Sequence, residues 1–273
     1  MNKLLLIFFT SMAFDCLFAS DLMAQDSTYN SSNNNRNAKK DRINRMLKME
    51  EDGDLIFNKH NIFGIKLSTD GYGVFFEKGK YISNSKTRIL QFELNEIRSP
   101  KEKRIPSDDI FFGSSVIAYK LNNFFQLKAS IGEERLIGGK GNKNGVAVTW
   151  LYTAGVGLGI LKPYYVNSTI SSDPSGNTHQ YTFAQILADT VNTYGIEGAA
   201  GILVGWGHIS LKPGLNAKTG MRFDYARFNT SITAIETGIK AEYYFGDIPM
   251  VYNVPSKALY FGGYVTIMFG GRK

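Results

Sequence analysis

The sequence predicts an all-β protein that closes into an eight-stranded antiparallel transmembrane barrel. Three long segments near the C-terminus, residues 208–225, 233–245 and 259–269, alternate apolar residues with polar, charged or small ones. Only a β-strand sends successive side chains to opposite faces. Strands in soluble sheets usually span about 5–6 residues, whereas a strand tilted across a bilayer needs ~9–11. This pattern is typical of a barrel with a lipid-facing exterior and a polar lumen.

Five further alternating segments precede these three. We predict strands at residues 62–76, 86–97, 111–121, 124–133 and 146–160. Asn122-Asn123 is expected to form a two-residue hairpin turn, because such turns need positive φ angles. The total of eight is even, as in bacterial single-chain barrels, and residues 61–273 form the barrel domain. Gly155, Gly157 and Gly159 point inward and leave room for a bulky group in the lumen.

The N-terminal part is expected to direct secretion. Residues 1–24 combine Lys3, an apolar run and a small residue, Ala24, at the expected cleavage site, which predicts a signal peptide. The only cysteine, Cys16, lies in this segment, so disulfides are not expected. Residues 25–60 are expected to form a periplasmic segment, partly disordered because it begins with a stretch rich in Asn and Ser. No later apolar run reaches ~18 residues, so the membrane is crossed by strands and the expected location is the outer membrane.

A long insertion, residues 161–207, separates the fifth and sixth predicted strands. It is too long for an ordinary connection. Its apolar run, residues 198–206, needs burial, so we expect the insertion to fold back into the barrel mouth and cap it. A cap that only stiffens the barrel and a ligand-selective plug or partner site are both compatible with the sequence.

The alternation places many charged residues in the lumen. The inward charges are Lys66, Asp70, Glu93, Lys128, Lys212, Lys218, Arg222, Asp224, Glu236, Lys240 and Glu242. Side chains fill the interior of an eight-stranded barrel, and buried charges must pair. We expect Lys218 or Arg222 to pair with Glu236 or Glu242. The lumen is therefore predicted to be filled by salt bridges, with a small gated pore as the alternative.

One short motif points to a different chemistry. His208 and Ser210 are two residues apart and share a strand face, so His208 could activate Ser210 as a nucleophile if a carboxylate oriented it. No acidic residue follows until Asp224. The three histidines lack metal-ligand spacing, and no metal or cofactor is expected. The net charge of +7 is spread over the lumen and the connections, so no nucleic-acid partner is expected.

The layout of signal peptide, eight alternating segments and Phe269 near the C-terminus resembles the small OmpA/OmpX-type outer-membrane barrels. From residue 146 onward, with Lys162-Pro163-Tyr164-Tyr165 and the Phe-Gly ending, the chain is similar to uncharacterised Bacteroidota outer-membrane barrels. The resemblance covers about residues 62–273. It implies contact with outer-membrane lipid, lipopolysaccharide and other outer-membrane or periplasmic proteins, in a non-enzymatic structural or interaction role. His-x-Ser on a barrel strand resembles the lipid A deacylases, although Leu211 replaces a polar residue of that pattern, and it implies a lipid-modifying hydrolase as the alternative.

Overall fold

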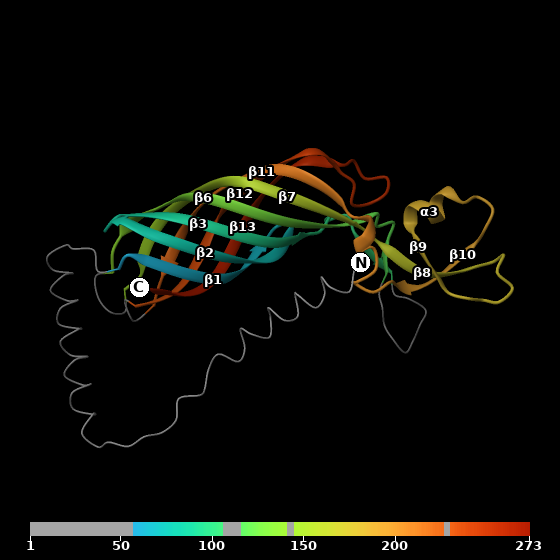
Figure 1. Cartoon of the computed structure of the whole chain (residues 1–273), viewed down its shortest axis with the longest axis horizontal. Helices are drawn as coiled ribbons and strands as arrows, with labels where there is room; N and C mark the ends of the chain where they lie inside the picture. The colour runs from blue at the N-terminus through green and yellow to red at the C-terminus, as the bar shows by residue number, and fades with distance from the viewer. Residues whose placement is uncertain (1–56, 106–115, 141–144, 227–229) are drawn as a thin grey trace, which may run out of the picture. The chain divides into compact units, whose positions relative to one another are not determined.

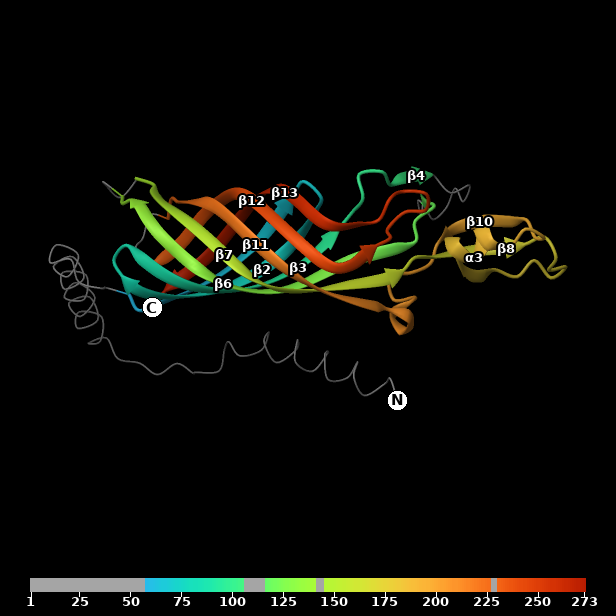
Figure 2. The ribbon, with the colours of Figure 1, turned by 90° about the horizontal axis from the view of Figure 1, so that it is seen from above.

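Eight antiparallel strands close into a barrel in the order β1-β13-β12-β11-β7-β6-β3-β2 (Figures 1 and 2). The computed structural model describes residues 57–105, 116–140, 145–226 and 230–273. The predicted signal peptide and nearly all of residues 25–60 lie outside these ranges. The barrel strands are β1 (Lys59–Ser68), β2 (Gly71–Ser83), β3 (Lys86–Ile97), β6 (Asn122–Gly138), β7 (Ala147–Pro163), β11 (Ser210–Asp224), β12 (Ser231–Ile248) and β13 (Lys257–Arg272).

The barrel is apolar outside and polar inside. Ile65, Val156 and Leu215 project outward and are each more than half exposed, whereas Lys66 and Glu236 project inward and are buried. Aromatic side chains such as Trp150 and Phe245 stand near the two ends of the exposed belt. No helix among the described residues is long and apolar enough to cross a membrane. An apolar belt flanked by aromatic residues around a polar interior is the arrangement of a transmembrane barrel.

The segment predicted as one strand, residues 62–76, is a hairpin. β1 and β2 pair with each other through a turn at Thr69-Asp70. The turn reverses the alternation, so Phe75 is buried in the lumen and Tyr72 is exposed outside. One continuous strand with Lys66 and Asp70 inward would have placed Phe75 outside and Tyr72 inside. Asp-Gly between alternating segments is a hairpin signal, and Asp70-Gly71 supplies it here.

The predicted strand at residues 111–121 is not a barrel strand. Its first part lies outside the described residues, and β5 (Val116–Ala118) pairs with β4 (Lys103–Ile105) in a separate two-stranded sheet. Asn122 and Asn123 begin β6 rather than forming a turn. The predicted total of eight strands is right because the missed hairpin offsets this extra strand.

The two ends of the barrel differ in their connections. One end, here called the terminus end, holds the pair His60–Arg272 and the short connections 84–85, 139–146 and 225–230. The opposite end, the loop end, holds the β1–β2 turn and the connections 98–121, 164–209 and 249–256. The two longest connections, 98–121 and 164–209, therefore lie at one end, an arrangement that the misassigned first and third strands had obscured.

The insertion forms its own small sheet. Its elements are β8 (Tyr165–Ile170), β9 (His179–Thr182), α3 (Phe183–Ala188), β10 (Tyr194–Ala199) and the 3-10 turn η1 (Trp206–His208), and the strand order is β10-β8-β9. α3 begins with a capping box in which Thr182 and Gln185 bond to each other's backbone N–H. Tyr164, Val166 and Phe183 pack with Val116 of β5 in a separate core.

The apolar run of the insertion does not enter the barrel mouth. Ile202 and Leu203 are 74% and 80% exposed. Trp206 stacks on Phe125, a residue of β6, with ring centroids 5.9 Å apart. The expected inward folding of residues 198–206 is therefore wrong, because the middle of this run is exposed and its last residue, Trp206, lies against β6 instead of in the lumen.

Candidate functional site

Charged side chains fill the lumen, and Glu93 is their centre. Glu93 projects from β3 and is 4% exposed. Its carboxylate lies 2.6 Å from Nζ of Lys66, 2.9 Å from Nζ of Lys128 and 3.5 Å from Nζ of Lys218. Lysines from three other strands thus converge on one buried carboxylate, an arrangement that offsets the cost of burying each charge.

From Glu93 the network extends toward the loop end. Lys128 lies 2.7 Å from Glu242, which also accepts a hydrogen bond of 2.6 Å from Gln126. Lys240 lies 3.3 Å from the same Glu242 carboxylate and 2.8 Å from Asp70 in the β1–β2 turn. The ion pairs therefore link β6, β12 and the β1–β2 turn across the lumen.

Toward the terminus end, Arg222 gathers three carboxylates. Its guanidinium donates two parallel hydrogen bonds of 2.8 Å to Glu77, which is the strong bidentate geometry. It also donates at 2.9 Å to Glu236 and at 3.2 Å to Glu134. Lys218 completes the link, 3.0 Å from Glu236. Of the pairings expected from sequence, the structure brings Lys218 and Arg222 to Glu236, whereas Glu242 binds other lysines.

Aromatic rings close the lumen at the loop end. Phe124 and Tyr244 pack edge to face with centroids 5.2 Å apart, and Tyr260 packs against both. A Cβ on Gly159 would lie 2.8 Å from the Phe124 ring and 3.1 Å from the Tyr244 ring. The space beside the inward glycines is therefore occupied by side chains of the barrel wall itself.

Two predicted lumen charges lie apart from this network. Lys212 is half-buried near the loop end, its Nζ 3.3 Å from where a Cβ on Gly246 would stand. Asp224 lies at the terminus end, where it pairs with Arg272 and, at 3.4 Å, with Lys140. Lys212 and Asp224 lie near the two ends of β11, and both are therefore beyond the ion pairs at the centre of the lumen.

Sequence reasoning missed three members of the site, His60, Glu77 and Glu134. Glu77 was missed because its strand was predicted to end at residue 76. The Asp70-Gly71 turn signal would have begun a new strand there and placed Glu77 at an inward position. His60 Nε2 lies 3.2 Å from Glu77. These three side chains offer ligand atoms within 4.8 Å of one another. Arg222 already donates to both carboxylates, so the cluster holds a guanidinium as its cation.

His208 and Ser210 do not form the predicted pair on one strand. His208 ends the η1 turn, whereas Ser210 begins β11, and both are exposed. Among the residues with described positions, no hydrogen bond joins the two side chains and none joins either of them to a carboxylate. The arrangement of nucleophile, base and orienting acid is not assembled in this part of the structure.

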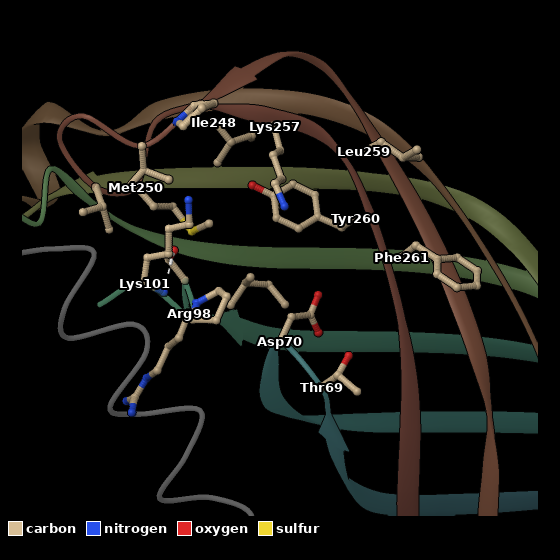
Figure 3. Close-up of a pocket in the computed structure, with 16 residues that line it drawn as sticks. Thr69, Asp70, Arg98, Lys101, Ile248, Met250, Lys257, Leu259, Tyr260 and Phe261 are labelled. Atoms are coloured by element: carbon tan, nitrogen blue, oxygen red, sulfur yellow. Dashed lines mark hydrogen bonds between the residues drawn. The ribbon is translucent and has the colours of Figure 1, made fainter. Parts of the chain in front are cut away.

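A second feature at the loop end is a notch in the barrel wall. It is the cavity of about 330 Å³ bounded by the β1–β2 turn, by residues 97–101 and by residues 248–261 (Figure 3). In Figure 3, Tyr260 and Asp70 point into the cavity, whereas Leu259 and Phe261 lie on the outer side of β13. The notch thus connects the lumen mouth with the lipid-facing wall.

These observations define a class of protein: an eight-stranded barrel of the outer-membrane type whose lumen is filled by ion pairs and closed by aromatic rings. No family model and no curated protein matches the chain.

Among solved structures, the chain is similar to Ail, the attachment invasion locus protein of Yersinia pestis, in complex with the heparin analogue sucrose octasulfate, with 11% identity, a TM-score of 0.39, and coverage of 80% of this chain and 100% of Ail. It is also similar to Neisserial surface protein A, with 9% identity, a TM-score of 0.37, and coverage of 79% and 95%. The N-terminal barrel of Pseudomonas aeruginosa OprF gives 10% identity, a TM-score of 0.33, and coverage of 78% and 98%. At these scores the assignment of the fold rests on the strand pairing described above.

Proposed function

We propose that the protein is a non-enzymatic outer-membrane barrel that anchors its loop-end insertion, residues 164–209, at the cell surface as a docking site for a partner. The filled lumen is the observation that carries this proposal. Ion pairs run without a break from Asp70 to Glu134, and aromatic rings stand above them. A barrel filled in this way supplies a rigid support rather than a path for solute.

The loop lengths support this orientation. Outer-membrane barrels have short periplasmic turns and longer extracellular loops, so the terminus end faces the periplasm and the loop end faces outward. Binding residues are often carried by loops on a rigid scaffold. The insertion is the longest connection and has its own sheet and core. It also exposes Val191, which is 89% accessible at the turn after α3.

The partner is expected to be another protein or glycan of the cell envelope, and the barrel wall is expected to contact outer-membrane lipid and lipopolysaccharide. A purely structural contribution to the membrane would leave the insertion without a role. A hydrolase would require Ser210 to act as a nucleophile. We expect Ser210→Ala to leave the acyl content of lipid A unchanged, and a change in that content would contradict the non-enzymatic assignment.

The test is to replace residues 164–209 by a short turn. Leu161 pairs with Ser210, so the ends of β7 and β11 are already adjacent and a tight turn can join them. We expect the shortened chain to insert and to show heat-modifiable migration, but to lose the proteins that cross-link to the native chain on intact cells. The matched control shortens residues 139–146 at the terminus end and should keep those cross-links. Retention of every cross-link by the first variant would contradict the proposal.

The lumen is tested separately by planar-bilayer recording. We expect the native chain to give no stepwise conductance. Steady channels from the purified chain would favour the gated-pore alternative.

A further inference from the structure

We propose that the notch binds an anionic acyl amphiphile, a molecule with a hydrocarbon chain and a phosphate or carboxylate head, which enters from the membrane through the barrel wall. This inference does not depend on the proposed docking role of the insertion. It concerns the opposite side of the loop end, between β13 and the residues that follow β3.

The notch exists because β13 is longer than its neighbour β1. The last β1–β13 pair is Ser68–Tyr264, followed by one hydrogen bond of 3.1 Å from Thr69 N to Gly263 O. Toward the loop end, β13 pairs only with β12 among the described residues. Backbone groups two residues apart point the same way, so those of Leu259 and Phe261 face the gap as Gly263 does.

The backbone groups on this open edge of β13 need polar partners. Leu259 and Phe261 are 61% and 69% exposed on the outer wall, which places the gap at the border of the lipid-facing belt. Lipid hydrocarbon cannot satisfy backbone N–H and C=O groups, and exposed sheet edges do not occur in it. The polar part of an amphiphile that reaches the gap from the membrane would meet these groups.

A buried hydroxyl inside the notch also lacks a partner. Tyr260 is 7% exposed, and its Oη has no hydrogen-bond partner in the described part of the chain. Figure 3 shows this side chain directed into the cavity. Buried polar atoms are nearly always hydrogen-bonded, so an oxygen atom of a bound molecule is a suitable partner for this hydroxyl.

The charges around the notch select an anionic head. Lys101, which follows β3, and Lys257, which begins β13, are exposed residues that line the opening, and neither has an acidic partner among the residues described. The acid at the floor, Asp70, is already paired with Lys240 at 2.8 Å. The remaining wall is mainly apolar and includes Ile248 and Met250. A head between the two lysines therefore leaves the hydrocarbon chain against the apolar wall.

The ligand is tested with spin-labelled probes and the full chain in zwitterionic nanodiscs. The probes are doxyl-stearic acid, doxyl-labelled lysophosphatidic acid and doxyl-labelled lysophosphatidylcholine. We expect the two anionic probes to broaden the methyl NMR signals of Ile248 and Met250, and the zwitterionic probe to broaden only lipid-facing methyls such as Ile239. Binding of the phosphate probe alone would identify a phospholipid-type head, and binding of the carboxylate probe alone would identify a fatty acid. Equal broadening by all three probes, or none at Ile248 and Met250, would overturn the proposal.

Two pairs of variants separate the site from general effects. Lys101→Glu with Lys257→Glu should weaken binding of the anionic probes about tenfold, because two ion contacts are reversed. Lys103→Glu with Arg104→Glu changes the same charge at the same end without lining the notch. It should leave binding unchanged, and an equal loss would show that the attraction is not site-specific.

The hydroxyl is tested by Tyr260→Phe, which should weaken binding about threefold through loss of one hydrogen bond. Tyr244→Phe removes another buried hydroxyl without a partner that does not line the notch. It should bind the probes as the native chain does. Tighter or unchanged binding by Tyr260→Phe would show that this hydroxyl does not contact the ligand.

Discussion

The ring of Tyr244 lies directly beside Gly159, so that a Cβ on the glycine would stand 3.1 Å from the ring carbons Cδ1 and Cε1. The two residues come from β12 and β7, which are not adjacent in the barrel. The ring therefore extends over β11, the strand between them, where a Cβ on Gly214 would also lie 2.6 Å from it. A small residue on one strand makes room for a large one on another, and this complementarity closes the loop end without a plug.

We predict that Gly159→Leu destabilises the barrel. The added side chain would overlap the rings of Phe124 and Tyr244, and overpacking of this kind costs about 1–3 kcal/mol. Tyr244→Ala leaves a cavity and should cost ~3–5 kcal/mol. The double variant should lose less stability than the sum of the two single losses, because the leucine fills part of that cavity. Urea unfolding in lipid vesicles measures all three, and additive losses would show that the residues do not share one space.

A second prediction concerns the centre of the ion network. Glu93→Gln would leave Lys66, Lys128 and Lys218 close together without the carboxylate that they share. Removing one partner from a buried ion cluster costs about 3–5 kcal/mol. Glu96→Gln is the control, because Glu96 projects outward from the same strand, where its partners are the partly exposed Arg98 and the exposed hydroxyl of Tyr72. It should cost roughly 0.2–1 kcal/mol. Similar losses in the same unfolding assay would argue against a network centred on Glu93.

Much of this interior could be predicted from sequence. In β11, β12 and β13 the alternation has no interruption over the membrane-spanning part, so the inward positions of Lys218, Glu236 and Tyr264 follow from a period of two. Each of these three residues is buried. The same reasoning predicted an inward position for Glu93 in β3, and Glu93 is 4% exposed.

The rest depended on contacts that alternation does not encode. A turn at Thr69-Asp70 changes the face of every later residue in β2, which is why Glu77 was missed. The apolar run around Ile202 looked as if it needed burial in the lumen, yet Ile202 is exposed and Trp206 at the end of the run stacks on Phe125 on the outer wall. Lipid can cover apolar residues there, so hydrophobicity alone does not tell the lumen mouth from the outside of a membrane protein.

The third prediction tests the assignment of faces in β11. Leu215 is 51% exposed on the lipid face, whereas Asn216 points inward and accepts a hydrogen bond of 2.6 Å from Ser130. An arginine on the lipid face near the bilayer centre costs ~2–4 kcal/mol. Leu215→Arg should therefore reduce the assembled fraction far more than Asn216→Gln. Band shift on an unheated gel measures that fraction, and equal effects would mean that the register of β11 is wrong.

A fourth prediction follows from three cations side by side on the outer wall. Lys59, Lys80 and Arg88 are direct neighbours across β1, β2 and β3 at the terminus end, and all three are exposed. Like charges directly opposite each other destabilise a sheet by roughly 0.2–1 kcal/mol per pair. Lys80→Gln should therefore stabilise the barrel in zwitterionic detergent. Membranes with anionic head groups should cancel this gain, because phosphates neutralise the native cations.

The control for Lys80→Gln is Lys103→Gln, since the cross-strand neighbour of Lys103 is Ala118. That change should leave stability unaltered in both media. If Lys80→Gln lowered stability in zwitterionic detergent, the three cations would not repel one another.

The last prediction concerns the pH dependence of the insertion, in the turn that joins α3 to β10. The Asp189 carboxylate accepts hydrogen bonds from the Asn192 side chain at 2.8 Å, from Tyr194 Oη at 2.7 Å and from the backbone N–H of Val191 at 2.9 Å. These donors hold the pKa of Asp189 well below its ordinary value, and the carboxylate in turn raises the pKa of Tyr194 to about 12. A lowered acid pKa contributes stability that is present above the ordinary value near ~3.9 and is lost as the pH falls through the folded pKa. The turn should therefore remain closed from mildly acidic pH up to about 12, where Tyr194 ionises.

Asp189→Asn removes the charge, so the pKa of Tyr194 should fall toward about 10, which an NMR titration of the tyrosine ring measures. Tyr181, another tyrosine of the same small sheet, serves as the internal reference, and an unchanged Tyr194 pKa in the variant would show that Asp189 does not hold this turn.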